Sequence, residues 1–137
     1  LVGADPLPEM YVGRLSAQTE SEVSDIVAKI VGYDSVPPAL LNQQILLAAD
    51  DDSLSFETGQ EDLVSLYLSD TKIPAERAYL RQLGVAATNQ KIRDTINLGA
   101  VTTNYLGHGN VHNWAAENVF IDTSDLPLLT NSDRPTF

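Results

Sequence analysis

The feature that most constrains this fold is an uninterrupted apolar run at residues 45–49, ILLAA, which is followed by three consecutive aspartates. A strand with one exposed face alternates apolar and polar residues, and this run does not alternate. Continuous apolar runs are typical of strands that are buried on both faces, as in parallel sheets with helices on each side. Residues 45–49 therefore predict an inner strand of a parallel α/β sheet.

The clearest helix is predicted to begin directly after Thr19. Thr19 and Glu22 have the spacing of a capping box, in which each side chain accepts a hydrogen bond from the other residue's backbone N–H. Apolar residues then recur at helical spacing and form one stripe. The stripe consists of Val23, Ile26, Val27, Ile30 and Val31. Gly32 predicts that this helix ends near Tyr33.

Two longer helices are predicted at residues 56–69 and 89–98, the second capped by Thr88 and ended by Gly99. Their inward-facing residues are expected to be Leu63, Leu66, Tyr67, Ile92 and Ile96. A short helix interrupted by Pro127 is expected at residues 123–130. Strands are expected at 10–15, 101–106 and 134–137, and also at 75–84, where a short helix is the alternative. Loops are expected at 34–42 and around His112, Trp114 and Phe120. Alternating strands and helices predict an α/β sandwich with a mainly parallel sheet.

Composition limits the chain to one domain and excludes several classes of protein. The 137 residues are 43% hydrophobic and 20% charged, as in an ordinary globular domain. No apolar run reaches the ~20 residues of a membrane span, and the opening LVGADPLPEM lacks a signal-peptide pattern. The first residue is leucine rather than methionine, which predicts a processed or excised piece of a longer protein.

The charge balance indicates which partners the chain would attract. With 19 acidic and 8 basic residues, the net charge of −11 disfavours nucleic acid. It favours cationic ligands, calcium or basic peptides. Cysteine is absent, which excludes a disulfide framework.

The expected strand at 101–106 stops abruptly at Gly107-His108-Gly109. In a parallel sheet, ligands and chemistry lie at the carboxyl ends of the strands. A histidine between two glycines offers a proton-transferring side chain beside exposed backbone N–H groups, which suits acyl transfer. An isolated G-H-G is also compatible with a histidine in a surface turn. A functional assignment therefore depends on the surrounding sequence.

Metal binding is an alternative use of the polar residues. His108 and His112 have the spacing of a zinc pair on a helix, but the glycines and Asn110 disfavour a helix there. The three aspartates 50–52 would repel one another unless they are solvated or share a cation such as calcium. A magnesium-binding receiver domain also has aspartates after a strand, but it needs a later acceptor aspartate and a later lysine. No lysine follows Lys91.

Four sequence blocks together resemble a known family. In chain order they are PEMYVGRLSAQTESEV, ILLAADDD, TTNYLGHGNVHNW and LPLLTNSDRPTF. They resemble the catalytic domain of the gingipain-type cysteine peptidases, peptidase family C25 of the caspase-like fold group. The resemblance implies a three-layer caspase-like sandwich that is incomplete at its C-terminus, with residues 1–137 forming a single, partial catalytic domain.

The resemblance also implies roles for individual residues. His108 matches the catalytic base of the family, and Gly109 matches the glycine whose N–H donates to the oxyanion. The acidic residue that orients the histidine in some members matches Asp51, with Asp50 and Asp52 as open alternatives.

Two residues are expected to contact substrate. Trp114 would form a wall of the substrate pocket or, alternatively, a buried anchor for its loop. Glu57 lies near the position of the family's acidic residue for basic side chains, which would suit Arg or Lys before the scissile bond.

The resemblance implies a cysteine endopeptidase whose nucleophile lies outside this chain, close after Phe137. The chain has no cysteine, so by itself it is expected to be inactive. The parent would be secreted or at the cell surface, would act on a peptide or protein substrate and would require no cofactor. The alternative is a non-catalytic caspase-like binding module that takes calcium through residues 50–52, with Asp50 and Asp52 as ligands.

Overall fold

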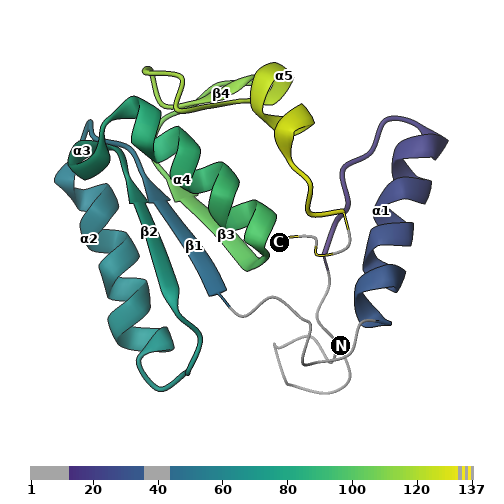
Figure 1. Cartoon of the computed structure of the whole chain (residues 1–137), viewed down its shortest axis with the longest axis horizontal. Helices are drawn as coiled ribbons and strands as arrows, with labels where there is room; N and C mark the ends of the chain where they lie inside the picture. The colour runs from purple at the N-terminus through teal and green to yellow at the C-terminus, as the bar shows by residue number, and fades with distance from the viewer. Residues whose placement is uncertain (1–12, 36–43, 133, 135, 137) are drawn as a thin grey trace, which may run out of the picture.

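The computed structural model describes residues 13–35, 44–132, 134 and 136. Three strands, β1 (Gln44–Ala49), β2 (Ala75–Tyr79) and β3 (Ala100–Leu106), form a parallel sheet in the order β2-β1-β3 (Figure 1). The expected α/β fold with a parallel sheet is confirmed, and the apolar run is its central strand. The arrangement is consistent with a caspase-like α/β sandwich.

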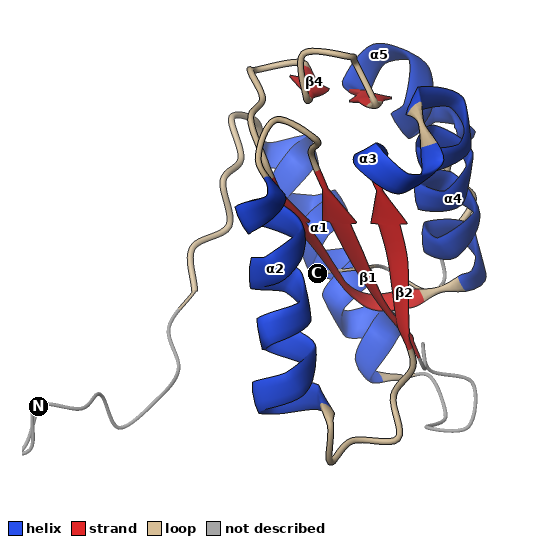
Figure 2. Ribbon diagram, turned by 90° about the vertical axis from the view of Figure 1, so that its left-hand side faces the viewer, coloured by secondary structure: helices blue, strands red, loops and turns tan. Residues whose placement is uncertain are grey.

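Helices cover both faces of this sheet. Figure 2 shows α2 (Leu54–Leu63) on one side of the strands and α4 (Val85–Leu98) on the other. Successive side chains of β1 point to opposite faces of the sheet, and both faces are covered, which explains why the run is continuously apolar. Leu46 and Ala48 belong to the core cluster that includes Ile92 and Ile96 of α4. Leu47 and Ala49 belong to the cluster that includes Phe56 and Val64 on the α2 side.

The helix predicted at 56–69 exists, but its inner face was predicted wrongly. It begins at Leu54 and continues into a π-helical segment, η2 (Val64–Leu68). Leu66 and Tyr67 are exposed, whereas Gln60 is fully buried. The Gln60 amide donates to the carbonyl oxygens of Ala48 and Asn104, at 2.8 and 3.1 Å. Its hydrogen bonds with the sheet therefore account for a polar residue on the inner face.

The predicted start of α4 was also wrong. The helix begins at Val85, and Thr88 is buried inside it rather than capping it. Gly84, with a φ of 75°, ends the short helix α3 (Leu80–Leu83) and begins α4. The expected strand at 75–84 accordingly ends at Tyr79. The inward positions of Ile92 and Ile96, and the helix end before Gly99, are confirmed.

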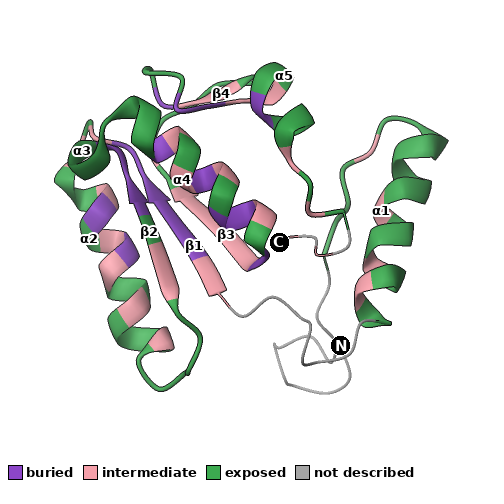
Figure 3. Ribbon diagram, in the orientation of Figure 1, coloured by how far each residue is buried: buried purple, intermediate pink, exposed green. Residues whose placement is uncertain are grey.

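The first helix, α1 (Glu20–Asp34), has the predicted capping box. It ends at Asp34, one residue beyond the expected end near Tyr33, and the N–H of its cap residue Ser35 donates to the Gly32 carbonyl at 3.1 Å. No residue of α1 is buried, as Figure 3 shows. Its apolar stripe is therefore not covered by the part of the chain that the structure describes.

The segment after β3 is more regular than expected. Where a loop was predicted, β4 (Asn113–Trp114) and β5 (Phe120–Ile121) pair in an antiparallel hairpin. The short predicted helix is divided into α5 (Asp122–Asp125) and the 3-10 turn η3 (Leu126–Leu128), which contains Pro127.

Other expectations fall largely outside the described residues. These are the strand at 10–15, the loop at 34–42 and the strand at 134–137. Of the described residues in the two strand segments, 13–15, 134 and 136, none is in a strand. No helix within the described ranges has the length and apolar character needed to cross a membrane.

Candidate active site

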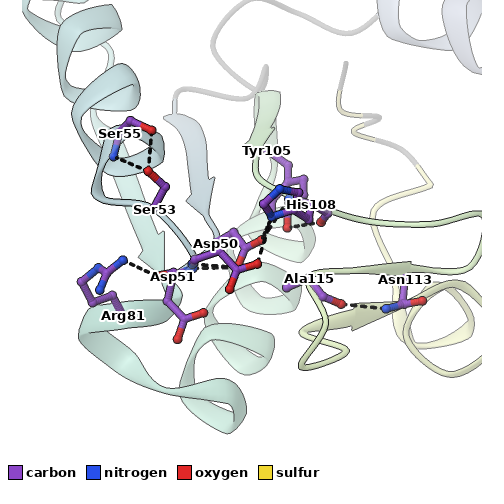
Figure 4. Close-up of polar contacts among 10 residues, drawn as sticks. Asp50, Asp51, Ser53, Ser55, Arg81, Tyr105, His108, Asn113 and Ala115 are labelled. Atoms are coloured by element: carbon purple, nitrogen blue, oxygen red, sulfur yellow. Dashed lines mark hydrogen bonds and ion pairs between the residues drawn. The ribbon is translucent and has the colours of Figure 1, made fainter.

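The candidate site lies where β1 and β3 end side by side. Asp50 follows β1, and its backbone N–H donates to the carbonyl of Leu106, the last residue of β3, at 3.1 Å. His108 lies two residues further along. Because the strands are parallel neighbours, this pairing brings Asp50 and His108 together, as Figure 4 shows.

Asp50 is fully buried and receives backbone hydrogen bonds from both strand ends. Its Oδ2 accepts from the His108 N–H at 2.9 Å, and its Oδ1 accepts from the N–H groups of Asp51 and Asp52 at 2.7 and 3.4 Å. Burial alone would raise the pKa of this carboxyl, but the three backbone donors outweigh burial and lower its pKa. Asp50 therefore ties the two loops together as a carboxylate.

The His108 ring contacts a second carboxylate. Its Nδ1 lies 3.0 Å from Asp52 Oδ2 and 3.4 Å from Asp50 Oδ2. Since an ionised carboxylate can only accept a hydrogen bond, this contact favours a proton on Nδ1 and leaves Nε2 as the basic nitrogen. The ring packs edge-on against Phe56, with centroids 5.4 Å apart, and 67% of the side chain is exposed. His108 is thus oriented and still accessible.

The two glycines beside His108 are required by close packing. A Cβ on Gly107 would lie 2.3 Å from the Asp50 Cβ and 2.5 Å from the Tyr105 hydroxyl. A Cβ on Gly109 would lie 2.9 Å from the Asn113 carbonyl oxygen. Among the described residues, none accepts a hydrogen bond from the Gly109 N–H.

The hairpin supports the His108 backbone from the other side. Both the Tyr105 hydroxyl and the Ala115 N–H donate to the His108 carbonyl, at 2.6 and 2.8 Å. Tyr105 stacks on Trp114 at a centroid distance of 4.6 Å, and Trp114 also packs against Phe120 at 5.0 Å. These contacts make Trp114 an anchor of the hairpin. Its role as a pocket wall stays a prediction.

Two supporting residues were not singled out from the sequence. Tyr105 and Phe56 both contact His108, and the pKa of Tyr105 is raised, chiefly by burial and also by the charge of Asp50. The signal for Tyr105 was its place three residues before His108. Phe56 gave no such signal, because its contact depends on how α2 packs.

Asp51, the first choice for the orienting acid, makes a different contact. The Arg81 guanidinium donates to the Asp51 carbonyl oxygen. Figure 4 shows the Asp51 side chain directed away from His108. Of the three aspartates, Asp50 and Asp52 contact the His108 imidazole in the described structure.

Glu57 is buried, with only 6% of the residue exposed. Its Oε1 lies 3.2 Å from Arg81 Nε, and its Oε2 accepts from the Gln82 amide at 2.8 Å. A basic substrate side chain would have to displace Arg81 to reach this carboxylate. The predicted substrate contact of Glu57 therefore stays a prediction.

Two groups of side chains have ligand atoms close enough to share a cation. One group is Asp50, Asp52 and His108, and the other is Asp50, Asp51 and Glu117, each with its atoms within 4.8 Å of one another. The predicted calcium ligands Asp50 and Asp52 fall in the first group. Asp50 already accepts three backbone hydrogen bonds, which reduces what it can offer a cation.

The second histidine does not join the first. His112 Nδ1 lies 2.9 Å from Asp122 Oδ2, so His112 contacts a different carboxylate, beside the hairpin. It is absent from both candidate cation groups of the described residues.

An open hollow of about 290 Å³ lies next to His108. His108 and Gly109 line it together with three asparagines, Asn110, Asn113 and Asn118. The candidate base and the candidate oxyanion donor therefore line the same open hollow.

Comparison with known proteins identifies the family of this chain. The sequence matches Peptidase family C25 over residues 1–137. Lys-gingipain W83 of Porphyromonas gingivalis is 27% identical over 143 aligned residues, which cover 97% of this chain and 8% of that protein. Gingipain R2 of the W83 strain of that organism is 22% identical, over 100% of this chain and 19% of its own length. Gingipain R1 is 24% identical, over 100% of this chain and 14% of its own length.

No solved structure matches the chain. The chain spans between 8% and 19% of the length of these three relatives. Because the family match extends over every residue from 1 to 137, the chain belongs to peptidase family C25.

Proposed function

We propose that this chain is the histidine-bearing portion of a gingipain-like cysteine endopeptidase, with His108 as its general base. The observation that supports this most strongly is the pair of contacts around His108: Asp50 holds its backbone and Asp52 its Nδ1. With the proton on Nδ1, Nε2 is the basic nitrogen, and it lies at the carboxyl end of a parallel strand. This is where an acyl-transfer enzyme places its base.

The nucleophilic cysteine is expected within about ten residues after Phe137, one strand's length. β3 pairs with β1 along one edge, and no described residue pairs as a strand with its other edge. A further parallel strand along that edge would end beside His108. A thiol there would be within hydrogen-bond reach of the imidazole.

In this mechanism His108 Nε2 takes the thiol proton, and the thiolate attacks the carbonyl carbon of the scissile peptide bond. The Gly109 N–H donates to the resulting oxyanion, a contact often worth ~3 kcal/mol in such sites. The imidazolium then gives its proton to the leaving amine as the C–N bond breaks. Water, deprotonated by His108, hydrolyses the thioester and restores the thiol.

Asp52, supported by Asp50, is our choice for the orienting carboxylate in place of Asp51, since both contact the ring. Trp114 and Glu57 remain the proposed substrate contacts. The relationship to gingipains further supports a peptide or protein substrate, a larger parent chain, and a secreted or cell-surface location, with no cofactor required.

The test uses the longer protein that contains this chain. We expect a cysteine shortly after Phe137, and we expect iodoacetamide to alkylate it and abolish hydrolysis of a fluorogenic peptide. Replacing that cysteine by serine should have the same effect. A parent without a cysteine in this window, or one that keeps its activity after complete alkylation, would rule out the proposal.

A non-catalytic module that binds calcium through residues 50–52 is the second candidate. Of the two groups of close ligand atoms, the one formed by Asp50, Asp51 and Glu117 consists of carboxylates alone. Oxygen-only groups suit this hard cation. Calorimetry with calcium on the 137-residue chain tests it, with Glu117→Gln as the matched variant. Absence of both heat and a shift in melting temperature would end this candidate.

A further inference from the structure

Arg81 connects the buried Glu57 to the loop that carries the orienting aspartates. Its Nε pairs with Glu57 Oε1 at 3.2 Å, without hydrogen-bond geometry, and its Nη2 donates to the Asp51 carbonyl oxygen. Glu57 is on α2 and Arg81 on α3, so one guanidinium joins two helices to the end of β1. Gln82 holds the other oxygen of Glu57 at 2.8 Å, which fixes the carboxylate.

The peptide group that Arg81 contacts also determines where Asp52 lies. The Asp51 carbonyl and the Asp52 N–H belong to the same planar peptide unit. Its oxygen accepts from Arg81, and its N–H points to Asp50 Oδ1 at 3.4 Å. A rotation of this peptide would lose both contacts and would carry Asp52 away from His108.

Asp52 depends on this support because its side chain is 51% exposed. An exposed carboxylate has rotamer freedom, and a lone surface ion pair seldom fixes a geometry. Its 3.0 Å contact with His108 Nδ1 therefore needs a fixed backbone.

We propose that Arg81, held by the buried carboxylate of Glu57, positions the Asp51–Asp52 peptide so that Asp52 keeps the proton of His108 on Nδ1. Both residues are positioning residues that act through Asp52. The inference rests on the proposed role of His108 as a base whose Nε2 is unprotonated. It gives Glu57 a role inside the fold in addition to the substrate contact proposed above.

The ratio of the two neutral imidazole tautomers measures this positioning. Nitrogen-15 shifts of the imidazoles in the 137-residue chain give the ratio directly, and His108 and His112 are the only histidines in the sequence. His112, paired with Asp122, is an internal reference.

We expect Arg81→Gln to lower the Nδ1–H to Nε2–H ratio of His108 at least threefold and to leave His112 unchanged. Arg77→Gln is the matched control. Arg77 also pairs with a glutamate of α2, Glu61, at 2.6 Å and carries the same charge, but it does not contact the aspartate loop. Its substitution should leave both histidines at their original ratios.

A second variant, Glu57→Gln, removes the ion pair while keeping the shape of the side chain. It should lower the His108 ratio in the same direction, and it provides the test if Arg81→Gln does not fold. If Arg81→Gln and Glu57→Gln both fold and His108 keeps its wild-type Nδ1–H to Nε2–H ratio in both, the proposal is wrong.

Asp52→Asn separates this inference from the proposed function. If Asp52→Asn lowers the ratio and the Arg81 and Glu57 variants do not, the positioning role is wrong and the His108–Asp52 pair stands. If Asp52→Asn also has no effect, the orienting pair in the proposed function is wrong as well.

Discussion

The two histidines of this chain make imidazole–carboxylate contacts that have similar geometry. His108 Nδ1 lies 3.0 Å from Asp52 and His112 Nδ1 lies 2.9 Å from Asp122, and their side chains are 67% and 70% exposed. Distance and exposure therefore do not distinguish the candidate catalytic histidine from the other one.

The difference lies in what holds each backbone. His108 follows a strand of the central sheet, and its N–H is bonded to the fully buried Asp50. The His112 N–H is bonded instead to the side chain of Asn110 within the same exposed loop. An imidazole–carboxylate pair thus becomes a candidate site when a buried carboxylate and a sheet edge fix it in place.

The largest expected effect compares the two imidazoles directly. In the longer peptidase, His108→Ala should lower kcat/KM by about 10²- to 10⁴-fold, the usual contribution of a general base. His112→Ala should change it less than twofold, because this imidazole faces Asp122 outside the hollow. Steady-state hydrolysis of one peptide substrate measures both. Equal losses in the two variants would mean that the comparison misidentifies the base.

The next effect compares the carboxylates. Asp50→Asn should lower the free energy of unfolding by about 2–4 kcal/mol, because an amide hydrogen would face buried N–H donors that have lost their charged acceptor. Asp122→Asn should cause little change, since the Asp122 side chain is partly exposed and solvent weakens its pairing with His112. Urea unfolding of the 137-residue chain measures both. A stable Asp50→Asn variant would show that the buried carboxylate does not hold the loops together.

Parts of this comparison could be predicted from the sequence. The continuous apolar run of β1 and the glycines beside His108 placed the candidate base at a strand end, which is confirmed. Which of three identical aspartates is buried could not be predicted. It depends on where β1 ends its pairing with β3, and a shift of one residue reverses the direction of every side chain.

The remaining errors have similar causes. Gln60 is on the inner face of α2 because it bonds to sheet carbonyls, and an apolar pattern cannot show that. The hairpin strands β4 and β5 are two residues each, too short for a periodic signal. Arg81 and Phe56 reach the site from α3 and α2, so their contacts depend on how these helices pack.

A smaller effect is expected at the glycine before His108. Gly107→Ala should lower the free energy of unfolding by about 1–3 kcal/mol, because its Cβ would overlap with Asp50 and Tyr105. Val111→Ala, next to His112, should have no effect because Val111 is 89% exposed. Thermal and urea unfolding measure both. If Gly107→Ala left the free energy of unfolding unchanged, the turn before His108 would accommodate a Cβ without cost. It would then be no more constrained than the exposed loop before His112.

The smallest expected effect is in the dependence of stability on pH. The pKa of Asp50 is lowered in the folded chain, because its backbone donors outweigh burial. A carboxyl whose folded pKa is below its unfolded value stabilises the fold above that unfolded value, about 3.9, and this stabilisation is lost as the pH falls through the folded pKa. Asp122 also has a lowered pKa, chiefly from its hydrogen bond with His112, but its side chain is partly exposed and is screened by solvent.

Urea midpoints between pH 5 and pH 2 should therefore fall less steeply in Asp50→Asn than in the wild type, while Asp122→Asn should follow the wild-type curve. The pKa of Glu61 is lowered to about 2, chiefly by Arg77, so Glu61 also contributes to the loss of stability at low pH. This contribution is the same in all three proteins and cancels when the variant curves are compared with the wild-type curve. If Asp122→Asn flattened the curve as much as Asp50→Asn, the two carboxylates would be equivalent in stability. The burial of Asp50 next to His108 would then not distinguish the His108 site from the His112–Asp122 pair.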